Sequence, residues 1–151
     1  MPTQAKRKLI HNKEVKLEIV ELQTESFHVF LHVLVNHKKV RMLLDTGASK
    51  TVLDKDFVES KLKSSKLETS NNPTSSLHAT VQSSDIMTAK SITIGSSKLK
   101  DYMITVLDLA HVNKTYKMVK CKPIQGILGS DILVEKQAII DYGKKQLKLK
   151  K

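Results

Sequence analysis

The amino-acid sequence predicts an all-β domain, built as a closed barrel or a sandwich with one or two short helices. Apolar and polar residues alternate along several runs, which is the period-2 pattern of strands with one buried face. These runs are short and closely spaced, and polar or glycine-containing turns separate them. The length of 151 residues, with 40% hydrophobic and 27% charged residues, fits one soluble domain. We assign residues 1–14 to a basic tail and residues 15–150 to this domain.

The clearest strands lie in the first third of the chain. A short strand is predicted over 15–22 and a longer one over 27–35. Residues 36–39 are polar and predict a hairpin connection to a strand over 40–44, which ends at the turn-forming residues 45–49. In the long strand, one face carries Phe27, Val29, Leu31, Val33 and Val35, and the other carries His28, Phe30, His32 and Leu34.

The later elements have weaker patterns. Asp54 is placed to cap a short helix over 55–61. Residues 63–76 are rich in Ser, Thr, Asn and Pro and predict a loop. The remaining expected elements are a strand over 77–87, a strand that begins near Ile92 and turns at 95–97, a strand over 102–109, a basic loop over 114–122, an apolar segment over 124–129, a helix over 131–136 capped by Ser130, and a hairpin over 138–149.

The net charge of +11 is concentrated at the two ends. Residues 1–13 hold four basic residues, residues 144–151 hold five, neither stretch contains an acid, and residues 14–143 carry only +2. Basic ends are usually solvated surface, and the alternative is attraction to nucleic acid or to an acidic partner. Aromatic residues make up 4% of the chain and Trp is absent, so stacking platforms for single-stranded nucleic acid are scarce.

The strongest chemical signal is the segment Leu43–Ser49, which reads Leu-Leu-Asp-Thr-Gly-Ala-Ser. An apolar strand delivers the Asp45 carboxylate to a tight turn, where Thr46 offers a hydroxyl and Gly47 lets backbone approach backbone closely. By itself the pattern is weak, because Asp-(Ser/Thr)-Gly arises by chance in roughly one chain of this size in ten to twenty. A plain β-turn, in which Asp45 accepts hydrogen bonds from nearby amides, is the alternative.

A second apolar segment favours a functional role for the Asp45 turn over a plain β-turn. Ile127, Leu128 and Gly129 lie about eighty residues further on and precede a helix start, so they can pass beneath the first turn and support it. The alternative is a buried strand with a glycine break before a capped helix. Residues 138–143, Ala-Ile-Ile-Asp-Tyr-Gly, then close as a hairpin.

Together these segments resemble the retropepsin-like aspartic proteases, the single-domain relatives of pepsin. The resemblance rests on the strand into Asp45–Ser49, on Thr51-Val52-Leu53, on Ile127–Gly129 and on the terminal hairpin, and it spans about residues 15–150. The chain looks most like the small soluble bacterial members. The resemblance implies a closed retropepsin-like (acid protease) barrel that forms a homodimer.

The implied activity is that of an aspartic endopeptidase. This chemistry needs two facing carboxylates, and the chain has one Asp-(Ser/Thr)-Gly, so the second Asp45 comes from an identical chain across a two-fold axis. The two carboxylates would share one proton and activate a water. By resemblance, Thr46, Gly47, Ile127, Leu128 and Gly129 support the site, and Gly47, Ala48 and Ser49 bind an extended peptide. The resemblance implies no metal and no other cofactor.

Two features depart from the family pattern. The family usually closes a glycine-containing flap over the substrate, but the corresponding span, about residues 70–88, contains no glycine. We expect residues 71–74, Asn-Asn-Pro-Thr, to replace it, because Asn tolerates turn conformations. Ser49, followed by Lys50, stands where the viral members have an acid. Two alternatives stay open: the missing flap glycine allows a retropepsin-fold peptide-binding module that does not cleave or cleaves only itself, and the basic ends allow a nucleic-acid-binding domain.

Other chemistry has little support in the sequence. His28 and His32 share a strand face, but a zinc site needs further converging ligands, and Cys121 is expected to be an inert thiol. No run approaches the ~20 apolar residues of a membrane-spanning helix. The N-terminus lacks the apolar region of a secretory signal. We therefore expect a cytoplasmic protein, either alone or as part of a longer precursor.

Overall fold

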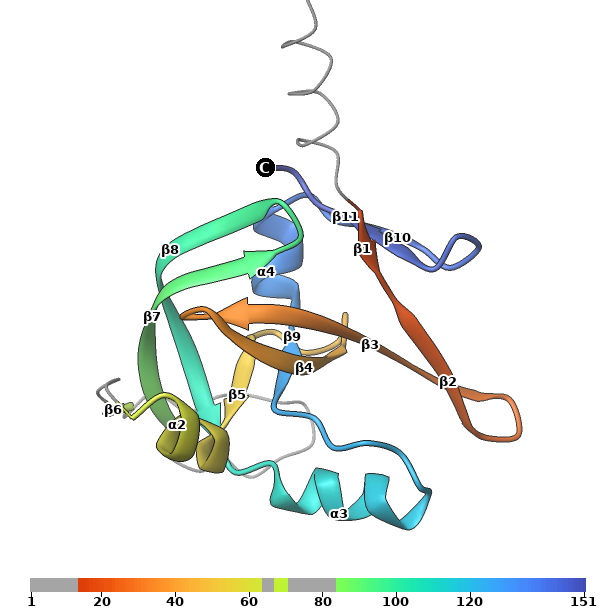
Figure 1. Cartoon of the computed structure of the whole chain (residues 1–151), viewed down its shortest axis with the longest axis horizontal. Coiled ribbons are helices and arrows are strands. Elements are labelled where there is room, and N and C mark those ends of the chain that lie inside the picture. Colours follow the sequence, from red (N-terminus) through yellow and green to blue (C-terminus); the bar gives the residue numbers. More distant parts are fainter. Residues whose placement is uncertain (1–13, 64–66, 71–83) are drawn as a thin grey trace, which may run out of the picture.

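The computed structural model describes residues 14–63, 67–70 and 84–151. In this part the fold is mostly β with a few short helices, as predicted (Figure 1). The strands are β1 (Val15–Lys16), β2 (Glu18–Gln23), β3 (Ser26–Val35), β4 (Lys38–Leu44), β5 (Val52–Asp54), β6 (Leu67–Ser70), β7 (Ser84–Ile94), β8 (Ser97–Leu107), β9 (Gly126–Leu128), β10 (Ile139–Asp141) and β11 (Gln146–Lys148). The helices are α2 (Lys55–Lys61), α3 (Ala110–Met118) and α4 (Ser130–Glu135).

Two sheets organise these elements. The larger has eight strands in the order β2-β3-β4-β9-β5-β8-β7-β6, and β7 also pairs with β3, which curls the sheet back on itself. The smaller has three strands in the order β1-β11-β10, and it joins the start of the described chain to its end. Strand β9 lies between β4 and β5, parallel to the first and antiparallel to the second. The chain therefore leaves β4, passes over the end of β9 and returns as β5.

The β3–β4 hairpin has a tighter connection than the polar residues 36–39 suggested. The turn is Asn36-His37, whose φ angles of 46° and 67° place both residues in the left-handed region. Two successive left-handed residues match the right-handed twist of a hairpin, and Asn is among the residues that tolerate them best. Lys38 and Lys39 therefore belong to β4.

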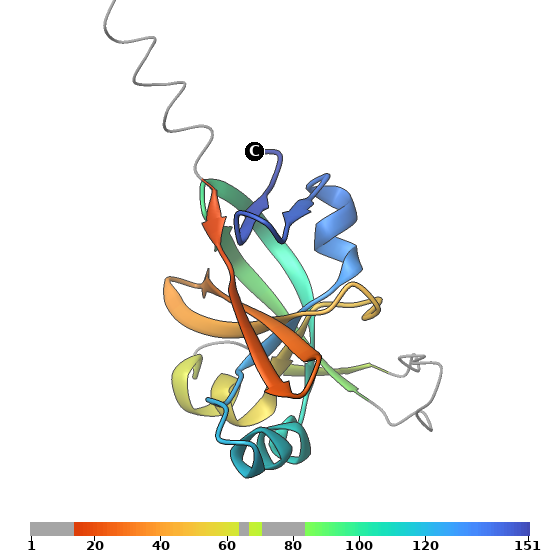
Figure 2. The ribbon, with the colours of Figure 1, turned by 90° about the vertical axis from the view of Figure 1, so that its right-hand side faces the viewer.

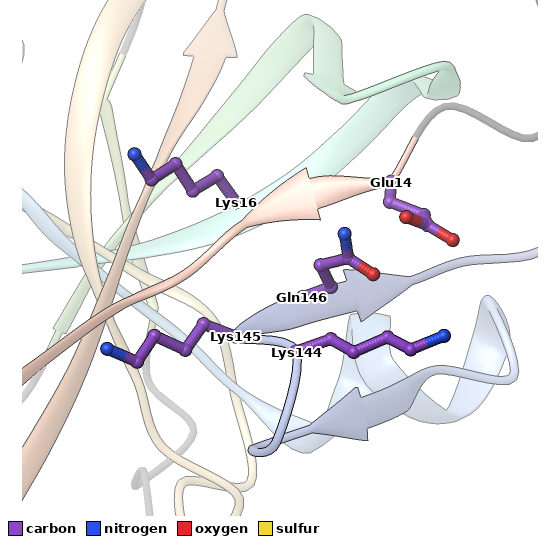
Figure 3. A pocket seen from close by; sticks show the side chains of 5 residues that line it. All are labelled: Glu14, Lys16, Lys144, Lys145 and Gln146. Carbon is purple, nitrogen blue, oxygen red and sulfur yellow. The ribbon is translucent and has the colours of Figure 1, made fainter.

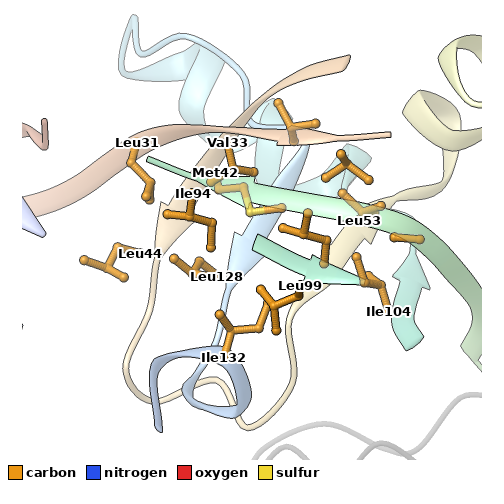
Figure 4. Close-up of a cluster of buried hydrophobic side chains, with 14 of the residues drawn as sticks. Leu31, Val33, Met42, Leu44, Leu53, Ile94, Leu99, Ile104, Leu128 and Ile132 are labelled. Carbon is orange, nitrogen blue, oxygen red and sulfur yellow. The ribbon is translucent and has the colours of Figure 1, made fainter. Parts of the chain in front are cut away.

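The main core is formed by the odd-numbered face of β3 and by residues from the strands around it. Figure 4 shows side chains from β3, β4, β5, β8, β9 and α4 pointing into one cluster. Its largest members are almost fully buried, including Leu31, Met42, Leu53, Ile104 and Leu128. Phe27 shares the sequence register of this face but is 58% exposed, because β3 extends beyond the core at that end.

A second buried cluster lies on the opposite face of β3 and β4. It contains Phe30, Val52, Leu109, Tyr116 and Ile124. Phe30 is fully buried, although its face of β3 also carries His28 and His32. Both faces of this hairpin are therefore covered, one by the main core and the other by α3 and the segment that follows it.

Several predicted boundaries were wrong. Residues 114–118, predicted as part of a basic loop over 114–122, belong to α3, since burial of Tyr116 in the second cluster secures a helix that is otherwise mostly polar. Ile92 and Ile94 end a long strand rather than begin one. The predicted loop over 63–76 contains β6. Residues 71–83, including the expected flap turn, lie outside the described residues.

Helix α2 begins after Asp54 as predicted, but neither predicted side-chain cap is formed. The Asp54 side chain does not cap α2, because its Oδ1 accepts a hydrogen bond from the Leu109 amide at 2.9 Å. Helix α4 includes Ser130 as its first residue and follows Gly129, with no side-chain cap. The hairpin near the C-terminus is present as β10 and β11. Within the described ranges, no helix is long and apolar enough to cross a membrane.

Burial in β8 gives a direct test of the main core. Ile104 is fully buried and its neighbour Met103 is 64% exposed. We expect Ile104→Ala to lower the free energy of unfolding by about 2–5 kcal/mol, because it leaves a cavity. Met103→Ala, the matched control on the same strand, should change it by less than about 0.5 kcal/mol. Urea denaturation measures both, and equal effects would contradict the assigned strand faces.

Candidate active site

The Asp45 loop, residues 45–51, connects β4 to β5 and is held by hydrogen bonds within the loop and to β9. The Asp45 amide donates to the carbonyl of Leu128 at 3.0 Å, and the Ala48 amide donates to the carbonyl of Asp45 at 3.2 Å. The Gly47 amide donates to Oδ1 of Asp45 at 2.9 Å, so one carboxylate oxygen is fixed. Oδ2 has no hydrogen-bond partner among the residues that the structure describes. The carboxylate is thus half-buried, oriented and still able to take a ligand.

The segment Ile127–Gly129 passes beneath this loop. Leu43 and Leu44 of β4 pair with Ile127 and Leu128 of β9, and the Ser130 amide donates to the carbonyl of Ala48 at 2.8 Å. A Cβ at Gly129 would lie 2.7 Å from the carbonyl carbon of Lys50, so only glycine fits at this crossing. The structure therefore brings together the two segments that are about eighty residues apart in sequence.

A polar network that sequence reasoning missed fixes the same crossing. The Gly129 amide donates to Oγ1 of Thr51 at 3.1 Å, and this hydroxyl donates to Oδ1 of Asp131 at 2.7 Å. The Tyr102 hydroxyl donates to Oδ2 of Asp131 at 2.9 Å. Burial, followed by the hydrogen bond to Asp131, raises the pKa of Tyr102 above its ordinary value. Thr51 was visible as part of the family resemblance, but no local pattern links it to residues 102 and 131.

The predicted peptide-binding residues lie at the outer side of the loop. Thr46, Gly47 and Ser49 are exposed, and Ala48 is half-buried. The Thr46 hydroxyl has no partner among the described residues of its own chain. Figure 2 shows the Asp45 loop on the same side of the molecule as α4 and β10. The loop therefore presents its polar groups outward, where another molecule can reach them.

The second buried cluster borders this site. Leu43 and Ile127 are half-buried and pack against it, next to the Asp45 loop. Here Nδ1 of His28 and the hydroxyl of Tyr116 form a 2.9 Å hydrogen bond, and the Arg41 guanidinium lies 4.1 Å from the Phe30 ring centroid. Burial raises the pKa of Tyr116 to about 12, with smaller contributions from Cys121 and Asp45. No group of three or more metal-binding side chains occurs in the described chain.

A sequence profile described as aspartyl protease matches residues 31–132, a span that includes both the Asp45 loop and Ile127–Gly129. The chain belongs to the aspartyl protease family. This confirms the family predicted from the sequence. A search of curated proteins found no match.

Solved structures of aspartyl protease relatives show the same fold. A retropepsin-like aspartic protease from Rickettsia conorii is 22% identical, with a TM-score of 0.55, 91% of this chain covered and 92% of the other. The retroviral protease-like domain of Ddi1 from Leishmania major is 14% identical, with a TM-score of 0.53 and coverages of 80% and 86%. The EIAV protease, solved with an inhibitor, is 22% identical, with a TM-score of 0.54 and coverages of 74% and 90%. The aspartyl protease fold here is thus retropepsin-like.

The Thr51 network predicts an effect on the stability of this member of the aspartyl protease family. Thr51→Val keeps the shape of a fully buried side chain but leaves the Gly129 amide and Asp131 without their shared partner. We expect a loss of about 1–3 kcal/mol in the free energy of unfolding. Ser49→Ala, on the same loop but exposed, should have almost no effect. A Thr51→Val protein as stable as the Ser49→Ala control in chemical denaturation would contradict this role.

Proposed function

We propose that this protein is a homodimeric aspartic endopeptidase, with one Asp45 from each chain at a shared active site. The observation that carries the proposal is the loop itself: a carboxylate with one oxygen fixed and one open, in a chain of the aspartyl protease family. Ile127, Leu128 and Gly129 support the loop from beneath, and Gly47, Ala48 and Ser49 provide backbone groups for an extended peptide.

The mechanism follows from two like charges at short distance. Two carboxylates about 3 Å apart do not both ionise readily, so the Asp45 pair holds one proton between them. The ionised carboxylate takes a proton from a bound water, whose oxygen then bonds to the scissile carbonyl carbon. The protonated carboxyl donates a hydrogen bond to the carbonyl oxygen. Collapse of the tetrahedral intermediate breaks the C–N bond, and the proton taken from water passes to the leaving amine.

Two features of the chain suit the proposed dimer. The Thr46 hydroxyl, unpartnered among the described residues, is free to hydrogen-bond across the two-fold axis near Gly47 of a second copy. Strand β10 is an edge of the three-stranded sheet, and Val134, Ile139 and Tyr142 are 75%, 62% and 61% exposed beside it. An open strand edge with exposed apolar side chains is a surface that pairs with another strand. Isologous pairing of β10 with its copy covers this surface.

The basic residues near the C-terminus do not favour the nucleic-acid alternative. Lys16, Lys144 and Lys145 line a cleft of about 410 Å³ with Glu14 and Gln146. Figure 3 shows the side chain of Lys144 directed away from those of Lys16 and Lys145, so the three cations do not converge on one point. They therefore do not form one binding site for a single phosphate group.

Replacement of the carboxylate tests the catalytic role. We expect Asp45→Asn to lower cleavage of unfolded peptides by at least about 10²-fold, because the general base is lost. Asp101→Asn, at an exposed position of β8, is the matched control and should cleave like the wild type. Peptide cleavage is followed by mass spectrometry across pH 3–8, with peptide binding measured in parallel. Equal cleavage by wild type and Asp45→Asn would exclude the proposed chemistry, and binding without cleavage by the wild type would establish the peptide-binding module instead.

Because each chain holds one half of the proposed active site, activity should depend on protein concentration. Activity per chain should fall on dilution, and Ile139→Lys should shift the fall to higher concentration, because a charge on β10 opposes edge pairing. Met103→Lys, equally exposed but on β8, is the control. Sedimentation velocity and specific activity are measured over the same concentrations. A fully active monomer would show that the dimer is not required.

A further inference from the structure

A cleft of about 360 Å³ lies on the face of the hairpin that carries the second buried cluster. It is lined by His32, Lys39, Arg41, Lys122, Pro123 and Gln125. The residues come from β3, from β4 and from the segment between α3 and β9. Four of the six side chains are basic. This concentration is notable because residues 14–143 as a whole carry only +2.

The charge in the cleft is only partly balanced. Glu18 of β2 bonds to Nη1 of Arg41 at 2.7 Å, and no other acid of the described chain forms an ion pair with Lys39, Arg41 or Lys122. Three permanent cations thus face one carboxylate. Partial burial, then Lys39, Arg41 and Lys122, hold the pKa of His32 below its ordinary value, and Glu18 opposes them. The cleft therefore has an uncompensated positive field.

Arg41 is built into this cleft rather than lying loosely over it. Its side chain is 7% exposed, its guanidinium stacks on Phe30, and its Nε is buried without a partner among the described residues. Its backbone is locked to Gln125 twice: the Arg41 amide donates to Oε1 of Gln125, and the Gln125 amide donates to the Arg41 carbonyl, both at 2.8 Å. Burying a cation with an unsatisfied donor costs free energy, which an anionic ligand nearby would offset.

The cleft and Asp45 are joined by a single strand face. Arg41, Leu43 and Asp45 alternate along β4 and its end, so their side chains leave the same side of the sheet. Leu43 and Ile127 are half-buried apolar residues that lie between Arg41 and Asp45. Four residues of extended chain separate Arg41 from Asp45, which is about 13 Å. A peptide bound at Asp45 in extended form covers that distance in about four residues.

We propose that this cleft, the Arg41 cleft, binds an acidic side chain of the peptide substrate about four residues from the scissile bond. The inference rests on the proposed endopeptidase function and adds a substrate class to it. A carboxylate there would accept hydrogen bonds from Lys39, Lys122 and the side-chain amide of Gln125, in the field of Arg41. A volume of about 360 Å³ has room for an Asp or Glu side chain. The scarcity of aromatic residues also disfavours a nucleic-acid strand as occupant.

Binding is tested without cleavage, on Asp45→Asn protein. Two peptides are compared that differ only by Glu or Gln at the fourth residue from the scissile bond, on each side in turn. We expect the Gln peptide to bind roughly tenfold more weakly. The double variant Lys39→Gln/Lys122→Gln should remove this difference, and the matched control Lys98→Gln/Lys100→Gln on β8 should keep it. Equal binding of the two peptides would overturn the proposal.

The His32 ring reports occupancy directly. A bound carboxylate should raise the pKa of His32, as Glu18 already does, whereas Lys39, Arg41 and Lys122 lower it. NMR titration measures this shift. The His32→Gln variant assigns the signal. A shift with inorganic phosphate but with neither peptide would overturn the proposal in favour of a free-phosphate site. Wild-type cleavage of both peptides at equal rates would also overturn it while leaving the proposed function intact, whereas Glu-selective binding without cleavage would remove only the proposed function.

Discussion

The constraint on which the site depends is the crossing of β9 beneath the Asp45 loop. Gly129 lies so close to Lys50 and Ala48 that a single added carbon would sit 2.7–2.8 Å from their backbone atoms. The crossing exists because β9 is inserted between β4 and β5, so the connection between those strands must arch over its end. Gly126, at the other end of β9, is confined in the same way between Val52 and Met42. The Asp45 carboxylate is therefore positioned by two glycines distant from it in sequence.

Hydrogen bonds convert this close contact into a fixed geometry. Thr51 satisfies the buried amide of Gly129, and Asp131 holds Thr51 and Tyr102 at the same time. Every polar atom in that chain of contacts has a partner, which is the condition under which a buried network adds rigidity. Arg41, on the neighbouring face, does not meet this condition because its Nε is unpartnered. The Thr51 network is thus explained by the structure alone. The buried charge of Arg41 is not, and the carboxylate that we propose to bind in the Arg41 cleft would offset it.

The sequence predicted the elements whose pattern is local. Strands β3 and β4 alternate clearly, and the Asp45 loop carries its own motif, so the strands, the turn and the family were accessible. Helix α3 was missed because its sequence is mostly polar and its one buried residue, Tyr116, is secured by contacts with His28 and Phe30 on another element. Asp54 was assigned to the wrong partner because the Leu109 amide, 55 residues away, competes successfully for its carboxylate. The Thr51–Asp131–Tyr102 network is invisible for the same reason, since no local spacing encodes it.

The proposed dimer and the proposed Arg41 cleft together have a consequence for how a peptide binds. A two-fold dimer has two Arg41 clefts, one on each side of the shared dyad, but a peptide has a direction and cannot match both in the same way. An acidic residue on one side of the scissile bond would engage either cleft, according to the direction in which the peptide enters. The two directions of entry are equivalent by symmetry, so the acidic residue would select which peptide bond lies at the dyad and not the orientation of the peptide. A symmetric enzyme with charged clefts at about 13 Å from the dyad would therefore choose the bond that it cleaves by the distance of that bond from an acidic residue.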